Sequence, residues 1–267
     1  SSPTWAGNGD HRRYLHQHLN DRVFADIPGL MHNVECVTRH LREKNGDALG
    51  AGGLETLKLV PTREGTSFVE APDGFWRTYE FIDGTESYDL CQGEDQAYEA
   101  ARAFGSFQAE LIDLDVERLR ETIPGFFSPA HRWRQFTAAR LRDPVRRLAE
   151  VGDEVRFVEA RRSMIRVIDD HLRSGDFPLR IVHGDTKLNN VLFDRKTGKA
   201  RSVIDLDTCM PAWSLYDFGD LVRFTAATSQ EDETDLDLVG SDLDLYRALV
   251  AGYLESTHAF LTDAEIA

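Results

Sequence analysis

The pattern of apolar and polar residues predicts β-strands in the first third of the chain. The turn-forming sequences Glu64-Gly65 and Pro72-Asp73-Gly74 separate short runs of apolar and β-branched residues. These runs cover residues 13–19, 54–62, 66–71 and 75–82. Short runs bounded by glycine and proline are typical of antiparallel strands joined by tight turns. We therefore expect a small β-sheet in this region.

A helical pattern interrupts these strands and then dominates the rest of the chain. Asp26 is a candidate N-cap, Pro28 suits a first helical turn, and Gly46 follows the last apolar position. Between them, apolar residues recur at helical spacing at Leu30, Val34, Val37 and Leu41. The same spacing returns after residue 90, at Phe104, Phe107, Leu111 and Leu114. This order predicts an α+β fold, with a small sheet region carrying one helix and a larger, mainly helical region after it.

One further strand pair lies inside the helical half. The apolar runs Val191–Phe193 and Ser202–Ile204 flank Lys196-Thr197-Gly198-Lys199. This arrangement predicts a β-hairpin closed by a turn at Gly198. A polar loop precedes the hairpin and an acidic pair follows it.

The polar residues around this hairpin have the spacing of a phosphoryl-transfer site. Asp185, Lys187 and Asn190 lie at positions 0, +2 and +5 of the loop, and Asp205 lies at +20. In kinases an aspartate accepts the proton of the attacking hydroxyl, a basic residue reaches the transferred phosphate, and oxygen ligands hold Mg²⁺. Asp and Asn also occur in loops because they cap and turn the chain. The four together favour Asp185 and Lys187 as catalytic residues and Asn190 and Asp205 as Mg²⁺ ligands.

The same residues carry a resemblance to a known family. His183-Gly184-Asp185, followed by Asn190 and Ile204-Asp205, resembles the aminoglycoside phosphotransferase and choline kinase family. Residues 183–194 and 203–210 are most similar to its N-acetylhexosamine 1-kinase branch, and a weaker similarity covers nearly the whole chain. The resemblance implies a two-lobed protein-kinase-like fold that uses ATP and Mg²⁺ to phosphorylate a small molecule.

The resemblance also assigns the lobes and the nucleotide site. Residues 1–83 would form a nucleotide-binding lobe, and residues 84–267 a catalytic and acceptor-binding lobe. Gly7 and Gly9 would belong to a loop that covers the phosphates. The adenine edge would be held by the backbone of Glu80, Phe81 and Ile82. Taken alone, the glycine cluster would be a plain turn and the strand an ordinary edge strand, so both assignments depend on the resemblance.

Both ends of the chain depart from the family pattern. The resembling branch has a glycine-rich loop between two strands, but about a dozen residues precede the run 13–19, too few for both strands. We expect residues to be deleted or missing there, with a break between Gly9 and Asp10. Thr262-Asp263-Ala264-Glu265 resembles a helix capping box, yet the sequence stops two residues later. We therefore also expect an incomplete C-terminus.

The basic residue that anchors the α- and β-phosphates is not evident from the sequence. Kinases pair a lysine on a small-lobe strand with a glutamate on a helix. The run 13–19 contains Gln17 and His18 but no lysine, and the resembling branch would have a basic residue where His18 stands. Glu35 is the candidate helix glutamate, although an ordinary solvent-exposed glutamate is an equally good interpretation.

Composition limits the classes of partner. The 267 residues have a formal net charge of −15, which argues against nucleic acids and anionic membranes as partners. No window approaches 18 consecutive apolar residues, and residues 1–5 show no signal peptide. Cys36, Cys91 and Cys209 have neither metal-site nor disulfide spacing, which favours a cytoplasmic protein. The sequence leaves the oligomeric state open.

The expected acceptor is a monosaccharide, most of all an N-acetylhexosamine phosphorylated at its anomeric hydroxyl. This expectation comes mainly from the resemblance of residues 183–194 and 205–208. A neutral sugar needs several hydrogen bonds in fixed places, and Asp185 and Thr208 are the candidate substrate-binding residues. A cationic acceptor of the aminoglycoside or choline type needs acids instead, and the acidic stretch Gln230–Asp244 keeps that alternative open.

A second alternative is a pseudokinase that binds nucleotide without turnover. The short glycine region and the missing strand lysine favour it, while the complete set of four catalytic and metal-binding residues opposes it. Asp217-Phe218-Gly219-Asp220 resembles the metal triplet of protein kinases, but the metal-binding acid should follow the hairpin directly, where Asp205 lies. We therefore expect Asp217 to be structural, capping the next helix or bracing the catalytic loop.

Overall fold

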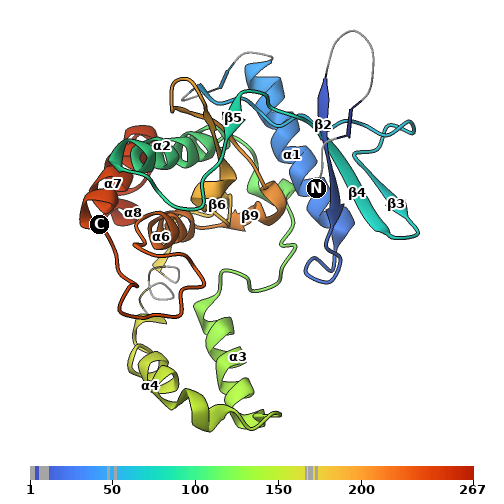
Figure 1. The fold of residues 1–267 in the computed structure, drawn as a ribbon. Coiled ribbons are helices and arrows are strands. Elements are labelled where there is room, and N and C mark those ends of the chain that lie inside the picture. Colours follow the sequence, from blue (N-terminus) through green and yellow to red (C-terminus); the bar gives the residue numbers. More distant parts are fainter. Residues whose placement is uncertain are drawn as a thin grey trace. The chain divides into compact units, whose positions relative to one another are not determined.

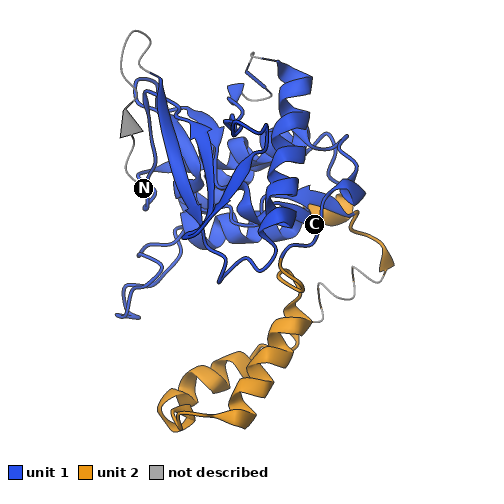
Figure 2. Ribbon diagram, turned by 90° about the vertical axis from the view of Figure 1, so that its right-hand side faces the viewer, with its two compact units in different colours: residues 1–122, 179–261 blue, residues 123–178, 262–267 orange. Residues whose placement is uncertain are grey.

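The computed structural model describes residues 4–5, 12–46, 49–50, 53–165, 167, 171 and 174–267. The chain divides into two compact units, one of residues 1–122 and 179–261 and the other of residues 123–178 and 262–267 (Figure 2). Gly7, Gly9 and the junction of Gly9 with Asp10 lie outside the described residues. The lobe boundary after residue 83 stays a prediction.

The first unit begins with a four-stranded antiparallel sheet in the order β1-β2-β4-β3. Its strands are β1 (Thr4–Trp5), β2 (Arg13–Leu19), β3 (Phe68–Ala71) and β4 (Gly74–Glu80). In the central pair, Gln17 lies opposite Arg77. The strands predicted at 13–19, 66–71 and 75–82 are confirmed. The strand predicted at 54–62 is wrong, since Leu59 alone forms a bridge there, and Pro61 lacks the N–H that a longer ladder would need.

Helix α1 (Ile27–Asn45) lies beside this sheet (Figure 1). The Asp26 carboxylate caps the helix by accepting a hydrogen bond of 2.8 Å from the N–H of Gly29. The helix ends at Gly46, whose φ of 62° suits a glycine. The predicted helix is therefore confirmed. Its buried side chains include Leu30, Val34 and Val37.

The larger part of the first unit is helical. It contains α2 (Glu94–Glu110), the 3₁₀ turn η2 (Val116–Arg118), α6 (Ser214–Thr225) and α7 (Leu243–Thr257). The two helices α2 and α7 pack closely along their length. At their crossing, Gly252 lies against the backbone carbonyl of Tyr98, where a Cβ atom would collide. The pair buries Phe104 and Leu249 in the core.

A three-stranded sheet, β5-β7-β8, and a two-stranded sheet, β6-β9, accompany these helices. The predicted hairpin is confirmed as β7 (Val191–Asp194) and β8 (Ala200–Val203), with Gly198 of its turn at a φ of 69°. The other strands are β5 (Thr85–Glu86), β6 (Arg180–Val182) and β9 (Met210–Ala212). Paired strands therefore hold both ends of the loops β6–β7 and β8–β9. These loops carry the predicted catalytic residues and the 3₁₀ turns η4 (Leu188–Asn190) and η5 (Leu206–Thr208).

The second unit is helical in its described part. It contains α3 (Pro129–Arg142), the 3₁₀ turn η3 (Leu148–Val151), α4 (Gly152–Ala160) and α8 (Asp263–Ile266). Arg140 of α3 forms an ion pair with Glu159 of α4. Thr262 and Glu265 form the capping box predicted from the sequence. Among the described helices of both units, none has the length and apolar character needed to span a bilayer.

Candidate active site

His183 begins the loop between β6 and β7, residues 183–190, which carries the candidate base and is called the catalytic loop below. Its side chain is anchored inside the protein. It has no exposed surface and packs edge-on against Phe104 and Phe107, with ring centroids 5.2 and 5.8 Å away. Its Nε2 atom lies 2.9 Å from the carbonyl oxygen of Ile204, which identifies Nε2 as the protonated nitrogen. Its Nδ1 atom then accepts a hydrogen bond of 3.3 Å from the N–H of Asp185. His183 therefore joins the loop after β6 to the loop after β8.

Asp217, in the first turn of α6, braces the same loop. Its Oδ2 atom accepts hydrogen bonds from the N–H of His183 at 2.8 Å and the side-chain amide of Gln108 at 2.7 Å, and its Oδ1 atom accepts one of 2.8 Å from the N–H of Gly184. Burial raises the pKa of Asp217, while the backbone hydrogen bonds from His183 and Gly184 favour its ionised form. The predicted bracing role is confirmed by these contacts.

The predicted base and metal ligands come together at one end of the hairpin. The Nδ2 atom of Asn190 donates to the Asp185 carboxylate at 3.1 Å and to the Asp185 backbone carbonyl at 2.8 Å. The N–H of Ile204 donates to the backbone carbonyl of Asn190 at 2.9 Å, which brings the next residue, Asp205, alongside. Because Nδ2 is engaged, the amide oxygen of Asn190 is the atom that can ligate a cation.

Asp205 has an unusual backbone conformation. Its φ and ψ are both 61°, in the left-handed region, which residues with a side chain rarely adopt. Such conformations cost on the order of 1–3 kcal/mol and occur where the surrounding structure enforces them, often at functional sites. Desolvation raises the pKa of Asp205, and the carboxylates of Asp207 and Asp185 act in the same direction. A bound cation would relieve this repulsion.

The donor set fits a magnesium ion that binds together with a nucleotide. Asn190 and Asp205 supply an amide and a carboxylate oxygen, and Mg²⁺ commonly binds one or two carboxylates with waters and substrate phosphates. Within the described part of the chain, no three His, Cys, Asp or Glu side chains gather into a metal site of their own. The residues therefore suit a cation that arrives with phosphate ligands.

Lys187 is held between two carboxylates. Its Nζ atom lies 3.7 Å from the Asp185 carboxylate and 3.2 Å from the carboxylate of Glu231. Burial alone would lower the pKa of Lys187, but the charges of Asp185 and Glu231 outweigh this effect and raise it. Glu231 also pairs with Arg223 at 2.8 Å, and Lys187 and Arg223 lower the pKa of Glu231. A phosphate entering beside Asp185 would therefore compete with Glu231 for a fully charged lysine.

Thr208, the candidate acceptor-binding residue, lies in the turn η5. Its hydroxyl donates a hydrogen bond of 2.8 Å to the backbone carbonyl of His183. The hydroxyl proton is thus used inside the site, and the oxygen lone pairs remain available to accept from a ligand. Its role in acceptor binding stays a prediction.

The candidate adenine-binding segment leads out of β4. The N–H of Glu80 donates to the carbonyl of Lys58, and the N–H of Phe81 donates to that of Arg13, both at 2.9 Å. These two N–H groups are used within the small lobe. Among the hydrogen bonds of the described residues, the N–H of Ile82 has no such partner. The adenine-binding role stays a prediction.

Arg77 of β4 is a buried basic residue next to the site. It was not identified from the sequence as part of the surroundings of the site. Its Nη1 atom donates to the Asp207 carboxylate, and its Nε atom donates to the side-chain oxygen of Gln17 at 2.9 Å. A signal was present in the sequence, because Phe75, Arg77 and Tyr79 alternate along one face of a predicted strand. A charged residue between two aromatic residues on that face needs a buried partner.

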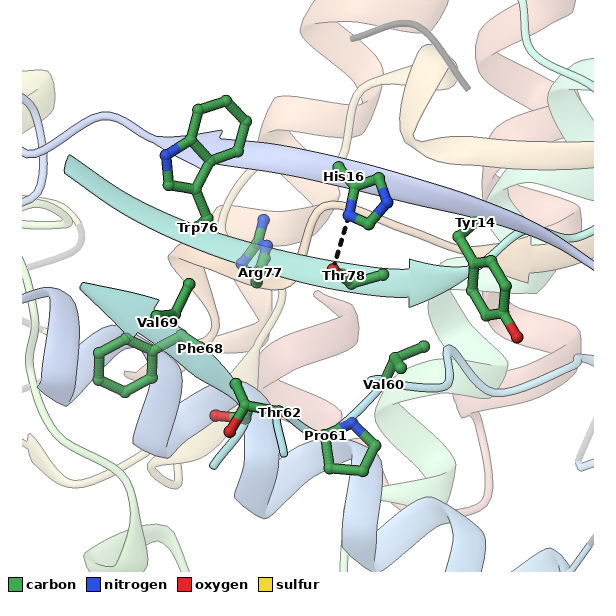
Figure 3. A pocket seen from close by; sticks show the side chains of 11 residues that line it. Tyr14, His16, Val60, Pro61, Thr62, Phe68, Val69, Trp76, Arg77 and Thr78 are labelled. Carbon is green, nitrogen blue, oxygen red and sulfur yellow. Dashed lines mark hydrogen bonds between the residues drawn. The ribbon is translucent and has the colours of Figure 1, made fainter. Parts of the chain in front are cut away.

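The other face of the small sheet carries a hollow of about 550 Å³ (Figure 3). Tyr14, His16, Trp76 and Thr78 are among the residues that line it, and Nδ1 of His16 lies 2.8 Å from the Thr78 hydroxyl. Side chains alternate along a strand, so the guanidinium of Arg77 points away from Trp76 and Thr78. None of the predicted catalytic or metal-binding residues lines this hollow, so it is separate from the candidate active site.

Solved structures of other proteins share this fold. An aminoglycoside phosphotransferase from Alicyclobacillus acidocaldarius is similar with a TM-score of 0.60 and 16% sequence identity, covering 96% of this chain and 74% of that chain. A microcompartment-associated aminopropanol kinase gives a TM-score of 0.54 and 18% identity, covering 99% and 78%. An amicoumacin kinase in complex with AMP-PNP and Ca²⁺ gives 0.54 and 16%, covering 98% and 74%. These likenesses confirm the predicted kinase-like α+β fold.

The sequence model of one family matches a continuous stretch of the chain. The match runs over residues 36–253 and carries the description phosphotransferase enzyme family. It includes β4, the hairpin β7–β8 with both of its loops, the helix α2 and most of α7. The chain therefore belongs to the phosphotransferase enzyme family.

Proposed function

We propose that the protein transfers the γ-phosphoryl group of ATP to a hydroxyl group of a monosaccharide, most of all the anomeric hydroxyl of an N-acetylhexosamine. The observation that carries the proposal is the gathering of Asp185, Lys187, Asn190 and Asp205 at one end of the hairpin. Membership of a phosphotransferase family supports the reaction type. The choice of acceptor is the finer part of the proposal.

The roles follow from the contacts of each side chain. Asp185 accepts the acceptor hydroxyl proton while that oxygen bonds to the γ-phosphorus, and the bond from phosphorus to the β-phosphate oxygen breaks to release ADP. Lys187, beside Asp185, stabilises the charge on the transferred group. Asn190 and Asp205 would hold Mg²⁺, which would supply neutralising charge to the phosphates. Asn190 also orients the base through its hydrogen bond to Asp185.

A neutral sugar as acceptor is supported by the resemblance of residues 183–194 and 205–208 to the N-acetylhexosamine 1-kinase branch. The site offers hydrogen-bonding groups near the base, including the Thr208 oxygen and the backbone of the loop. A site that bonds specific hydroxyl groups discriminates strongly against molecules that lack them.

A cationic acceptor is the second candidate, and the loop after α6 favours it. The loop between Ala226 and Asp242 is closed by hydrogen bonds of 2.8 Å from Asp242 N–H to the Ala226 carbonyl and 3.1 Å from Thr228 N–H to the Gly240 carbonyl. It contains no Lys or Arg, and its acids are Glu231, Asp232, Glu233, Asp235 and Asp237. One of them, Glu231, reaches the catalytic loop. Similar structures include an aminoglycoside phosphotransferase and an aminopropanol kinase.

The test is an acceptor panel in a coupled assay of ADP release with Mg-ATP. The panel holds N-acetylglucosamine, N-acetylgalactosamine, other hexoses, choline, homoserine and an aminoglycoside. We expect turnover with an N-acetylhexosamine, and the variant Asp185→Asn to lower kcat by roughly 10²–10⁴ while keeping the melting temperature and nucleotide binding. Turnover of cationic acceptors without sugars would replace the sugar proposal by the second candidate. Nucleotide binding without any turnover would favour a pseudokinase.

A further inference from the structure

The small sheet meets the candidate metal site through an ion pair that differs from the lysine–glutamate pair of kinases. In kinases a strand lysine and a helix glutamate pair with one another, and this pair and the metal-binding aspartate must both be in place. Strand β2 has Gln17 and His18 but no lysine. Glu35 of α1 is turned to a different partner, because its carboxylate accepts a hydrogen bond from the hydroxyl of Ser67.

Arg77 makes a connection of another kind. Its side chain is 2% exposed and that of its ion-pair partner, Asp207, is 14% exposed. Its Nε atom donates to Gln17 at 2.9 Å, its Nη1 atom lies 3.8 Å from the sulfur of Met31, and its guanidinium lies 5.1 Å from the ring of Tyr79. A buried arginine in this setting depends on its carboxylate partner. The ion pair therefore fixes β4 to the loop that follows β8.

Three consecutive residues of that loop are held by three different elements. Arg77 of β4 donates to Asp207, and the Thr208 hydroxyl donates to the His183 carbonyl of the catalytic loop at 2.8 Å. The next carbonyl, that of Cys209, accepts a hydrogen bond of 3.0 Å from the side chain of Asn33 in α1. These contacts fix the turn η5. Asp205 immediately precedes this turn and has the left-handed backbone conformation that only a fixed turn would enforce.

We infer that Arg77 is a positioning residue, and that its ion pair with Asp207 connects the small sheet to the metal site. Arg77 acts by fixing the turn that orients the Asp205 carboxylate toward Mg²⁺. The inference rests on the Mg²⁺-nucleotide site proposed above. Because the guanidinium is buried, with Nε donating to Gln17 and Nη1 to Asp207, Arg77 acts on the metal ligand and not on the phosphates.

The test compares Arg77→Met and Arg77→Lys with wild type in binding assays that need no acceptor. A fluorescent ATP analogue reports the Mg²⁺ concentration at half-saturation, and the same analogue in EDTA reports metal-free affinity. Residues that orient metal ligands change metal affinity by roughly 10–100-fold, so we expect a rise of that size in half-saturating Mg²⁺ for Arg77→Met. Arg77→Lys should show a smaller rise, because lysine keeps the positive charge for Asp207. It should still show some rise, because an ammonium group cannot hold Asp207 and Gln17 together in the fixed geometry of a guanidinium. Affinity in EDTA should be unchanged.

A matched control separates this effect from lost stability. Arg102 of α2 forms an ion pair with Glu99 in which the side chains are 13% and 16% exposed, and Glu99 also accepts a hydrogen bond of 3.1 Å from the N–H of Ala200, at the turn end of the hairpin. Arg102→Met should lower the melting temperature without moving the Mg²⁺ dependence. The double variant Arg77→Met/Asp207→Asn should bind Mg²⁺ no more weakly than Arg77→Met alone, since both changes break one pair.

Two results would overturn the inference. One is an unchanged Mg²⁺ dependence in folded Arg77 variants, which would make the pair purely structural; if Arg77→Met does not fold, Arg77→Lys decides. The other is a lower affinity in EDTA with an unchanged Mg²⁺ dependence, which would make Arg77 a direct phosphate ligand. A wild-type protein that binds Mg²⁺ and nucleotide but phosphorylates no acceptor would refute the proposed function and leave this test intact.

Discussion

Replacement of Asp217 by alanine should remove a large share of the stability of the protein. The carboxylate is 1% exposed and accepts hydrogen bonds from His183, Gly184 and Gln108. Alanine would leave two buried donors and one partly buried donor without an acceptor, at about 1–3 kcal/mol each, and we take about 4–6 kcal/mol as the total. Whole proteins are stable by only about 5–15 kcal/mol. At about 2–4 °C per kcal/mol for chains approaching this size, the melting temperature should fall by roughly 10–20 °C.

Asparagine at the same position should cost less. Its carbonyl oxygen can keep the two donors that meet Oδ2, but its amide group would face the N–H of Gly184, so we expect a loss of about 2–3 kcal/mol. Thermal melts followed by circular dichroism measure both variants. At temperatures where Asp217→Asn remains folded, it should also turn over more slowly, because the residues before Asp185 lose a support.

Asp194 provides a matched control for this reasoning. Its Oδ1 atom also accepts three hydrogen bonds, from Lys196 N–H at 3.0 Å and from the N–H and hydroxyl of Thr197 at 2.9 and 3.0 Å. Its side chain is 26% exposed, so water can replace the carboxylate, and Asp194→Ala should lower the melting temperature much less than Asp217→Ala. Equal melting temperatures for Asp194→Ala and Asp217→Ala would refute the argument that burial sets the cost.

Three further predictions concern other parts of the chain. Glu231→Gln should lower the KM for ATP at low salt by a factor of about 1.4–5. The reason is that a surface ion pair worth about 0.2–1 kcal/mol no longer competes with the phosphate for Lys187. An unchanged KM would exclude this competition. Gly252→Ala should lower the melting temperature by about 2–10 °C, because the new Cβ would collide with the backbone of Tyr98. Gly219→Ala in α6, where a Cβ meets no other atom, should raise the melting temperature slightly. Similar melting temperatures for both variants would contradict the packing argument. Lys44 of α1 donates a hydrogen bond to the Asp113 carboxylate and lowers its pKa from the ordinary 3.8. The stabilisation of the folded protein by this pair is therefore present above pH 3.8 and is lost as the pH falls through the lowered pKa. Asp113→Asn should therefore melt below wild type at pH 6, with the difference closing toward pH values under 3.8, and a constant difference would argue against this ion pair.

The sequence predicted the features that depend on neighbouring residues. The cap of α1 at Asp26 and the hairpin turn at Gly198 are specified within a few positions, and both formed as expected. Asp185 and Asn190 share one loop, so their spacing indicated a common candidate site, and the structure adds a hydrogen bond between their side chains. The segment 54–62 had a strand-like composition, but its pairing depends on a neighbour far away in the sequence, and only one bridge forms.

The polar contacts that support the site could not be predicted in the same way. Arg77 and Asp207 are 130 residues apart, and the N–H of His183 and the Asp217 carboxylate are 34 residues apart. Periodicity shows that Arg77 shares a face with aromatic residues, but the identity of its partner depends on how β4 packs against the loop after β8. The pairing of Lys187 with Glu231 likewise depends on the path of the loop after α6.

The short connection between β4 and β5 has a mechanical consequence. β4 ends at Glu80 and β5 begins at Thr85, so four residues link the small sheet to a strand that is hydrogen-bonded to β7 of the catalytic hairpin. The link is held at Asp83, whose carbonyl accepts a hydrogen bond of 3.2 Å from Arg201 of β8, and Gly84 has a φ of 76°. The Arg77–Asp207 ion pair is a second connection, since it joins β4 to the loop after β8. With the short link at one end and this ion pair along its length, β4 is held at two points beside the candidate site residues, so the β3 edge of the sheet is the part least restrained by the hairpin.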